Sequence, residues 1–184
     1  DHSVRTAEIV ISEIGLGRNS TISTLLHDAA RLGLLNAEEI ERRFGAIPVS
    51  ILEGMNLISK VRTKISMSQA DNFRDLIVSY STDPRIILIK LADRLEVMRS
   101  LAMFPEAKQQ KKSWESMNLY AQIAHKLGLY SIKSELEDIA LKYLEPEEYA
   151  HISRKLAESA AERNEFIAGF AAPIREKLDA QGIR

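Results

Sequence analysis

The sequence contains no cysteine, and this absence excludes two classes of site at once. Without cysteine there is neither a disulfide nor a thiolate metal centre, so a metal ion would depend on nitrogen and oxygen ligands. Glycine and proline are also scarce, with 8 and 5 residues in a chain of 184. Because both residues interrupt helices, and the chain is rich in leucine, isoleucine, alanine, glutamate and lysine, we predict an all-α fold.

A strong excess of charge of one sign is missing as well. The chain has 25 Lys and Arg against 26 Asp and Glu, for a net charge of −1. Such a balance gives no general attraction to nucleic acid or to an anionic membrane, so neither is predicted as a partner. There is no run of 18 apolar residues and no signal-peptide pattern, and the cytoplasm is therefore the simplest expected location.

The most hydrophobic stretch, residues 83–103, is the one around which we expect the other helices to pack. Asp83 is a favourable N-cap residue, and Pro84 suits the first helical position because its missing N–H needs no partner there. Apolar side chains surround most of the circumference of this helix, as is typical of a central, buried one. They are Ile86, Ile87, Leu88, Ile89, Leu91, Ala92, Leu95, Val97 and Met98. Phe104-Pro105 is expected to end the helix.

Helical patterns fill most of the remaining chain. They cover residues 3–14, 22–30, 48–61, 69–80, 106–127 and 146–178, with a polar loop at 62–68. Asn36 and Glu39 form a capping-box pattern before a short helix that Gly45 would end, and Ser131 is a candidate N-cap for another helix. Pro173 should kink or break the last helix. The abrupt end of the chain suggests a piece of a longer protein.

Four residues form a candidate metal site. His27 and Asp28 are neighbours in an apolar helix, where their side chains point about 100° apart and both reach one ion over the helix edge. His2 and Asp93 are the candidate third and fourth ligands. Two imidazoles and two carboxylates suit manganese, iron or zinc better than calcium. The alternatives are structural: His27 is then an ordinary core histidine, and Asp93 pairs with Lys90.

Six segments resemble the hydrolase domain of the RelA/SpoT family, which makes and degrades the alarmones ppGpp and pppGpp. They are LLHD at 25–28, QADNFRDLI at 69–77, RIILIKLADRL at 85–95, YAQIAHKLGL at 120–129, IKSELEDIALKYL at 132–144 and PEEY at 146–149. The resemblance implies an HD-domain-like helical bundle over residues 1–144. It also implies a helical connector over 145–184, leading toward a synthetase domain that lies outside this chain.

The same resemblance implies a metal phosphohydrolase. His2, His27, Asp28 and Asp93 match the four manganese ligands of the family, and (p)ppGpp or a related guanine nucleotide would be the substrate. The ion would lower the pKa of water and take up phosphate charge as the 3′-pyrophosphate leaves.

At the acid–base position the chain departs from the family. A Glu-Asp pair is expected one turn after the HD doublet, but Arg31 and Leu32 stand there. A guanidinium with a pKa above 12 is no general base, and leucine transfers no proton. Val97 replaces the nucleotide-contacting Asn of the family, and Asn56 with Leu57 replaces its Thr-Lys.

These departures predict a degenerate, regulatory pseudo-hydrolase domain in which Ser100 and Asn56 remain as candidate substrate contacts. One alternative is an active 3′-pyrophosphohydrolase that uses Glu96, three residues after Asp93, as a substitute base. Another is a binding module that holds a nucleotide without cleaving it, or docks a partner through the Lys108–Lys112 face. We also predict that Arg31 replaces the metal by pairing with Asp28 or Asp93, the alternative being that it points into solvent.

Overall fold

The structure is a computed structural model that describes residues 2–62 and 83–181. All regular structure within these ranges is helical, which confirms the predicted all-α fold. The chain divides into two compact units, Asp1–Leu144 and Glu145–Arg184. The predicted loop at 62–68 and the predicted helix at 69–80 lie almost entirely outside the described residues, except that Arg62 is the last residue of a helix.

The first unit contains α1 to α9. Its elements are α1 (His2–Ser12), α2 (Arg18–Arg31), α3 (Ala37–Phe44), α4 (Ala46–Arg62), α6 (Pro84–Arg99), the 3₁₀ turn η2 (Leu101–Met103), α7 (Glu106–Glu115), the π-helical turn η3 (Ser116–Tyr120), α8 (Ala121–Lys126) and α9 (Tyr130–Leu144).

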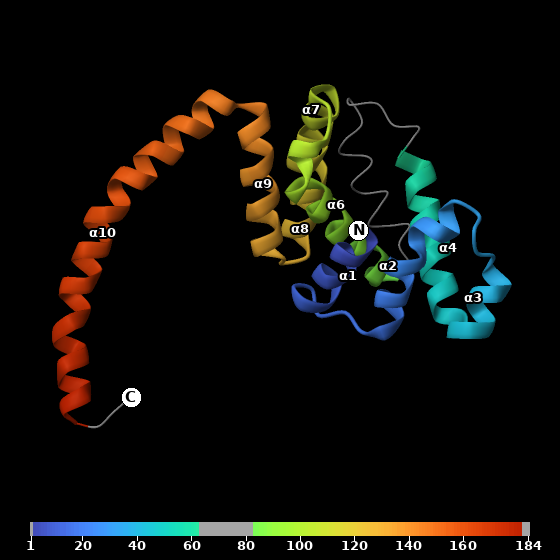
Figure 1. Cartoon of the computed structure of the whole chain (residues 1–184), viewed down its shortest axis with the longest axis horizontal. Coiled ribbons are helices and arrows are strands. Elements are labelled where there is room, and N and C mark those ends of the chain that lie inside the picture. The colour runs from blue at the N-terminus through green and yellow to red at the C-terminus, as the bar shows by residue number, and fades with distance from the viewer. Residues whose placement is uncertain (1, 63–82, 182–184) are drawn as a thin grey trace. The chain divides into compact units, whose positions relative to one another are not determined.

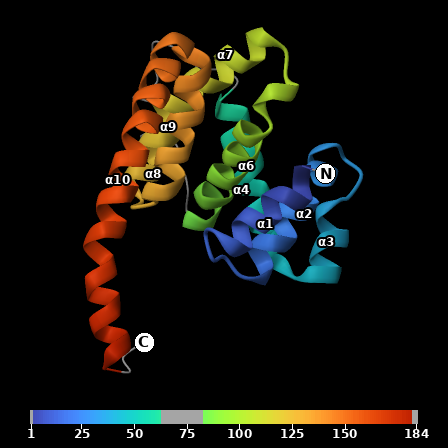
Figure 2. The same ribbon diagram turned by 60° about the vertical axis from the view of Figure 1, so that its left-hand side comes forward.

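The central position of α6 follows from its sequence. The Asp83 side chain accepts a hydrogen bond of 3.0 Å from the backbone N–H of Arg85, and Pro84 is the first helical residue, as predicted. Ile89, Leu91 and Leu95 are completely buried. The helix packs against α1, α4 and α9, which surround it in Figures 1 and 2. It therefore carries its polar residues into the middle of the unit.

The side chain of Ile86 on α6 packs closely against the backbone of α4 at Gly54. A Cβ atom added at Gly54 would lie only 2.2 Å from Cδ1 of Ile86. Glycine at this position thus removes the side chain that would separate the two helices. On the other side of α4, the short helix α3 begins as the capping pattern predicts, with the Asn36 side chain accepting from the Glu39 backbone N–H at 2.8 Å.

Several boundaries differ from the prediction. The central helix, expected to continue to Phe104-Pro105, ends at Arg99, and the 3₁₀ turn η2 follows it. The helix expected over 106–127 is interrupted by the π-helical turn η3, which includes one residue more than an α-turn. Ser131 is not an N-cap, because α9 already begins at Tyr130 and the Leu129 carbonyl accepts from the Lys133 N–H at 2.9 Å. Pro173 does not break the last helix, which continues through it.

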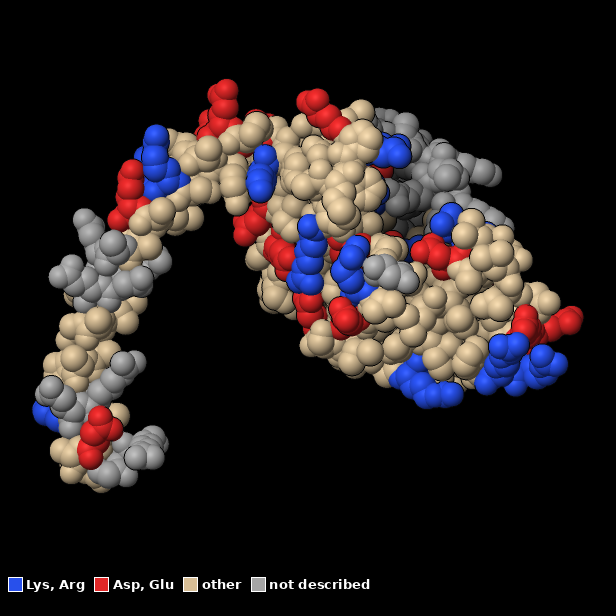
Figure 3. Space-filling model, viewed as in Figure 1, with Lys and Arg blue, Asp and Glu red and all other residues tan. Residues whose placement is uncertain are grey.

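The second unit contains α10 (Pro146–Ala180), a helix of 35 residues. Several of its apolar side chains are exposed, among them Phe166 and Phe170. On the face drawn in Figure 3, acidic and basic side chains are interspersed rather than gathered by sign. In the described ranges we find no helix with the length and hydrophobicity needed to cross a membrane.

Candidate metal and nucleotide site

Three helices bring the predicted ligands into one region. His2 lies in the first turn of α1, and its Nε2 is 2.9 Å from Oδ1 of Asp93 on α6. The neighbouring Ser3 donates a hydrogen bond of 3.2 Å to Oδ2 of Asp28 on α2. The start of α1 thus contacts both candidate carboxylate ligands, although 91 residues separate His2 from Asp93.

The His2–Asp93 contact is an ion pair at neutral pH. The hydrogen bond to Asp93 raises the pKa of His2 to about 9. Burial on its own would raise the pKa of Asp93, but the hydrogen bond from His2 and the charge of Lys90 lower it to about 2. The predicted alternative, an ion pair between Asp93 and Lys90, is not seen among the described residues, and Lys90 acts on Asp93 only at longer range.

The His27 ring is buried and only partly satisfied by the residues around it. Burial, followed by the charge of Lys90, lowers the pKa of His27 to about 4, so the ring is neutral at pH 7. Its Nε2 is buried and has no hydrogen-bond partner in the described part of the chain. Its Nδ1 lies 3.9 Å from Oδ1 of Asp28. A neutral imidazole with an unpartnered buried nitrogen is the form that binds a metal ion.

The carboxylate of Asp28 is already paired with the guanidinium of Arg31. The Arg31 guanidinium donates to its Oδ1 through Nη2 at 3.0 Å and Nε at 3.4 Å. Although burial opposes it, the Arg31 hydrogen bond lowers the pKa of Asp28. Arg31 therefore does not simply point into solvent, and it pairs with Asp28 rather than with Asp93. Leu32, the second substituted acid–base position, is 63% exposed at the end of α2.

Glu96 has a full set of partners. Its Oε2 contacts Nδ1 of His2, while its Oε1 accepts from Arg5 at 2.6 Å and from Ser100 at 3.0 Å. The residue is only 3% exposed. Burial would raise the pKa of Glu96, but the hydrogen bonds from Arg5 and His2 lower it. Arg5 was not among the predicted site residues, because no local pattern connects it with Glu96.

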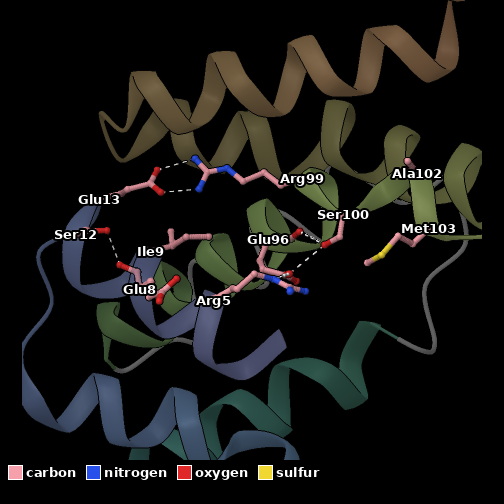
Figure 4. A pocket seen from close by; sticks show the side chains of 10 residues that line it. All are labelled: Arg5, Glu8, Ile9, Ser12, Glu13, Glu96, Arg99, Ser100, Ala102 and Met103. Carbon is pink, nitrogen blue, oxygen red and sulfur yellow. Dashed lines mark hydrogen bonds and ion pairs between the residues drawn. The ribbon is translucent and has the colours of Figure 1, made fainter. Parts of the chain in front are cut away.

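A cleft of about 530 Å³ lies beside this carboxylate, between α1, the end of α6 and η2. Arg5, Glu96 and Ser100 line it, as Figure 4 shows. Arg99 is at the same wall but is held by bidentate ion pairs with Glu13 and Glu135, which raise the pKa of its guanidinium. Of the two candidate substrate contacts, Ser100 lines this cleft. Asn56 is on α4 and does not line the cleft.

The predicted ligands share a region but do not surround one point. Within residues 2–62 and 83–181, no three His, Asp or Glu side chains converge closely enough to hold an ion. The reason is visible in their contacts, since His2 is engaged by two carboxylates and Asp28 by Arg31. The donor types nevertheless fit an ion such as Mn²⁺, because they are imidazole nitrogens and carboxylate oxygens, and Nε2 of His27 has no hydrogen-bond partner among the described residues.

Comparison with known proteins decides the family. A family model described as an HD domain matches residues 1–130. The chain belongs to the HD domain family. This match confirms the predicted kind of helical fold.

The names of similar proteins are more specific than the description of the family model. The chain is 40% identical to a guanosine-3′,5′-bis(diphosphate) 3′-pyrophosphohydrolase of Aquifex aeolicus, over 94% of this chain and 25% of that protein. It is 35% identical to a GTP pyrophosphokinase of Myxococcus xanthus, over 95% and 24%. It is 31% identical to the bifunctional (p)ppGpp synthase/hydrolase SpoT of Escherichia coli, over 99% and 26%. The chain therefore spans about a quarter of the length of these relatives, and their names support the RelA/SpoT resemblance.

Proposed function

We propose that this chain is the hydrolase-like domain of a RelA/SpoT-type (p)ppGpp synthetase/hydrolase, and that it is catalytically impaired and regulatory. The observation that carries the proposal is the ion pair between Arg31 and Asp28. It places a permanently charged cation on a candidate metal ligand, at a position where the resemblance implies a carboxylate acid–base group. A domain built in this way retains the fold of the hydrolase while lacking its proton-transfer residues.

His2, His27, Asp28 and Asp93 are the residues that would hold a divalent ion such as Mn²⁺. When bound, the ion would supply Lewis-acid chemistry by polarising water and neutralising phosphate charge. Some of the protein's own contacts have to change before an ion can bind. The neutral His27 ring presents a nitrogen lone pair, whereas His2 has to exchange its contact with Asp93 and Asp28 has to release Arg31. Metal binding therefore competes with protein ion pairs, and we expect weak affinity.

The loss of acid–base residues accounts for the expected impairment. Removing a general acid or base alone slows a reaction about 10²- to 10⁴-fold. The exposed leucine at position 32 has no group that exchanges a proton, and a guanidinium group has no acceptor atom with which to take one up. Val97 further removes a hydrogen-bonding side chain from α6. These substitutions act on separate steps, so turnover should be very low.

A regulatory role is consistent with what remains. The cleft beside Ser100 leaves room for part of a nucleotide. Relatives that include synthetase activity in their names extend well beyond the region matched here. We propose that conformational changes in this domain are passed to the synthetase domain of the same full-length protein.

A second candidate is an active (p)ppGpp 3′-pyrophosphohydrolase. It is favoured by the name and the 40% identity of the Aquifex relative and by the unpartnered Nε2 of His27. A third, nucleotide binding without cleavage, is favoured by the cleft alone.

One assay separates the three. The purified domain is incubated overnight with ppGpp and excess Mn²⁺, and GDP and pyrophosphate are resolved by ion-exchange chromatography beside an intact family hydrolase. Isothermal titration with ppGpp is run in parallel. Neither product above the metal-only blank nor ppGpp binding supports the impaired, regulatory domain, and binding without product supports the nucleotide-binding module. GDP formation within tenfold of the intact enzyme would overturn the proposed impairment.

A further inference from the structure

The contact between Glu96 and His2 is the strongest feature that the proposed function does not use. It joins the first turn of α1 to the middle of α6, between residues 94 positions apart. Glu96 touches Nδ1 of the imidazole, and Nε2 of the same ring lies 2.9 Å from Asp93. One nitrogen thus faces the supporting carboxylate and the other faces the candidate ligand set.

We propose that Glu96 is a positioning residue that holds the His2 ring with Nε2 directed toward Asp93. The expected effect of Glu96 on metal binding rests on the proposed function, because the orientation of the His2 ring matters for an ion only if these residues form a metal site. Histidine ligands commonly donate their second ring N–H to a carboxylate, which fixes the ring orientation and makes the ligating nitrogen more basic. Here the Glu96 carboxylate contacts Nδ1 of His2, and Nε2 of the same ring faces the candidate ligand Asp93.

The surroundings of Glu96 support a holding role over that of a substitute base. Both oxygens are in use, Oε2 by His2 and Oε1 by Arg5 and Ser100. Ser100 also donates to the Glu96 backbone carbonyl at 2.6 Å, so the serine is fixed to the same turn. A carboxylate with contacts on both oxygens would have to give up one of them to act as a base. Because the group is 3% exposed, the bonds also prevent it from turning toward water.

Arg5 determines which oxygen of Glu96 remains for His2. Its Nε donates to Oε1 from the turn of α1 that follows His2, while half of its side-chain surface remains exposed. The two α1 residues therefore take different oxygens of one carboxylate. This division leaves Oε2 for His2 and prevents the carboxylate from rotating freely.

The test compares Mn²⁺ affinity, followed through the EPR signal of free Mn²⁺, in four proteins: wild type, Glu96→Leu, Glu96→Gln and Glu8→Gln. Glu96→Leu removes the acceptor and should weaken binding about 10- to 100-fold. Glu96→Gln keeps an acceptor oxygen and should recover part of that loss. Glu8→Gln removes a carboxylate from the same cleft, and none of its contacts involves His2, so it should stay within about twofold of wild type.

A second readout needs no metal. In metal-free protein labelled with ¹⁵N-histidine, the His2 Nδ1–H should give a signal protected from solvent exchange, assigned by its loss in His2→Gln. The signal should disappear in Glu96→Leu and persist in Glu8→Gln. A protected signal that survives in Glu96→Leu would overturn the positioning role, as would equal Mn²⁺ affinity of Glu96→Leu and wild type.

The two readouts also separate this inference from the proposed function. If wild-type protein binds no Mn²⁺, the proposed metal site is wrong, and the NMR signal then decides the holding role alone. The role stands if the signal is present and is lost only with Glu96, and it falls if wild type lacks the signal.

Discussion

The Arg31 guanidinium donates a hydrogen bond of 3.0 Å to the carboxylate of Asp28, one turn earlier on α2. This pair joins the residue that most departs from the hydrolase pattern to the carboxylate of the HD doublet. Arg31 has 54% of its side-chain surface exposed, so its position is set by the pair rather than by burial. The arrangement leads to predictions about metal affinity, stability and turnover.

Replacing Arg31 with alanine should strengthen Mn²⁺ binding. An exposed ion pair of this kind contributes about 0.2–1 kcal/mol, so releasing Asp28 corresponds to an affinity gain of about 1.4- to fivefold. An EPR titration of free Mn²⁺ measures it. Arg43→Ala is the matched control, because it breaks a similarly exposed pair with Glu39 on α3. Equal affinity of Arg31→Ala and wild type would show that Arg31 does not compete with the ion.

Replacing Arg94 with methionine should destabilise the first unit severely. Arg94 is 3% exposed, bonds Glu115 at 2.8 Å and lies 4.2 Å above the Tyr120 ring. Leaving a buried carboxylate without its cation costs about 3–5 kcal/mol. Urea unfolding measures the loss. The double variant Arg94→Met/Glu115→Leu removes both charges and should recover most of it, whereas additive losses in the double variant would contradict the coupling.

The Asp83 cap makes stability depend on pH. The hydrogen bond from Arg85 lowers the pKa of Asp83 in the folded state, so its contribution is complete above the ordinary pKa of 3.8 and is lost as pH falls through the lower folded value. At pH 7 Asp83→Ala should lower the free energy of unfolding by about 1 kcal/mol.

Urea titrations of the Asp83 variants at pH 7 and pH 2.5 test this dependence. The difference between wild type and Asp83→Ala should shrink at the lower pH. Asp83→Asn keeps a capping oxygen and should resemble wild type more closely at both. A difference that is the same at both pH values would show that the charge of Asp83 has no part in the cap.

Local signals in the sequence were sufficient for much of the fold. The caps at Asn36 and Asp83 could be predicted because donor and acceptor lie within three residues of each other. The π-helical turn η3 could not, since it includes Tyr120, whose ring packs on Arg94 of a different helix. Ser131 failed as a cap because Gly128 and Leu129 had already turned the chain into α9.

Only part of the candidate site could likewise be predicted from local signals in the sequence. His27 and Asp28 form a doublet, and their shared location needs only helix geometry. His2 and Asp93 were candidates as the third and fourth ligands, and the resemblance to the RelA/SpoT family implies the same four residues. The contacts of Glu96 with His2 and Arg5 connect residues more than 90 positions apart, and no periodicity in the sequence reports such a pair. The contacts of Glu96 with these two residues arise only from the packing of α1 on α6.

The most direct test of the account restores the missing acid–base pair. The variant Arg31→Glu/Leu32→Asp is compared with wild type for GDP release from ppGpp in saturating Mn²⁺, with Arg42→Glu/Arg43→Asp on α3 as a control for changed charge. We expect the restored variant to be at least about 10²-fold faster than wild type, because general acid–base groups contribute at least that much, and the control to remain at the wild-type rate. A wild-type rate that already equals that of the restored variant would contradict the claim that Arg31 and Leu32 impair hydrolysis.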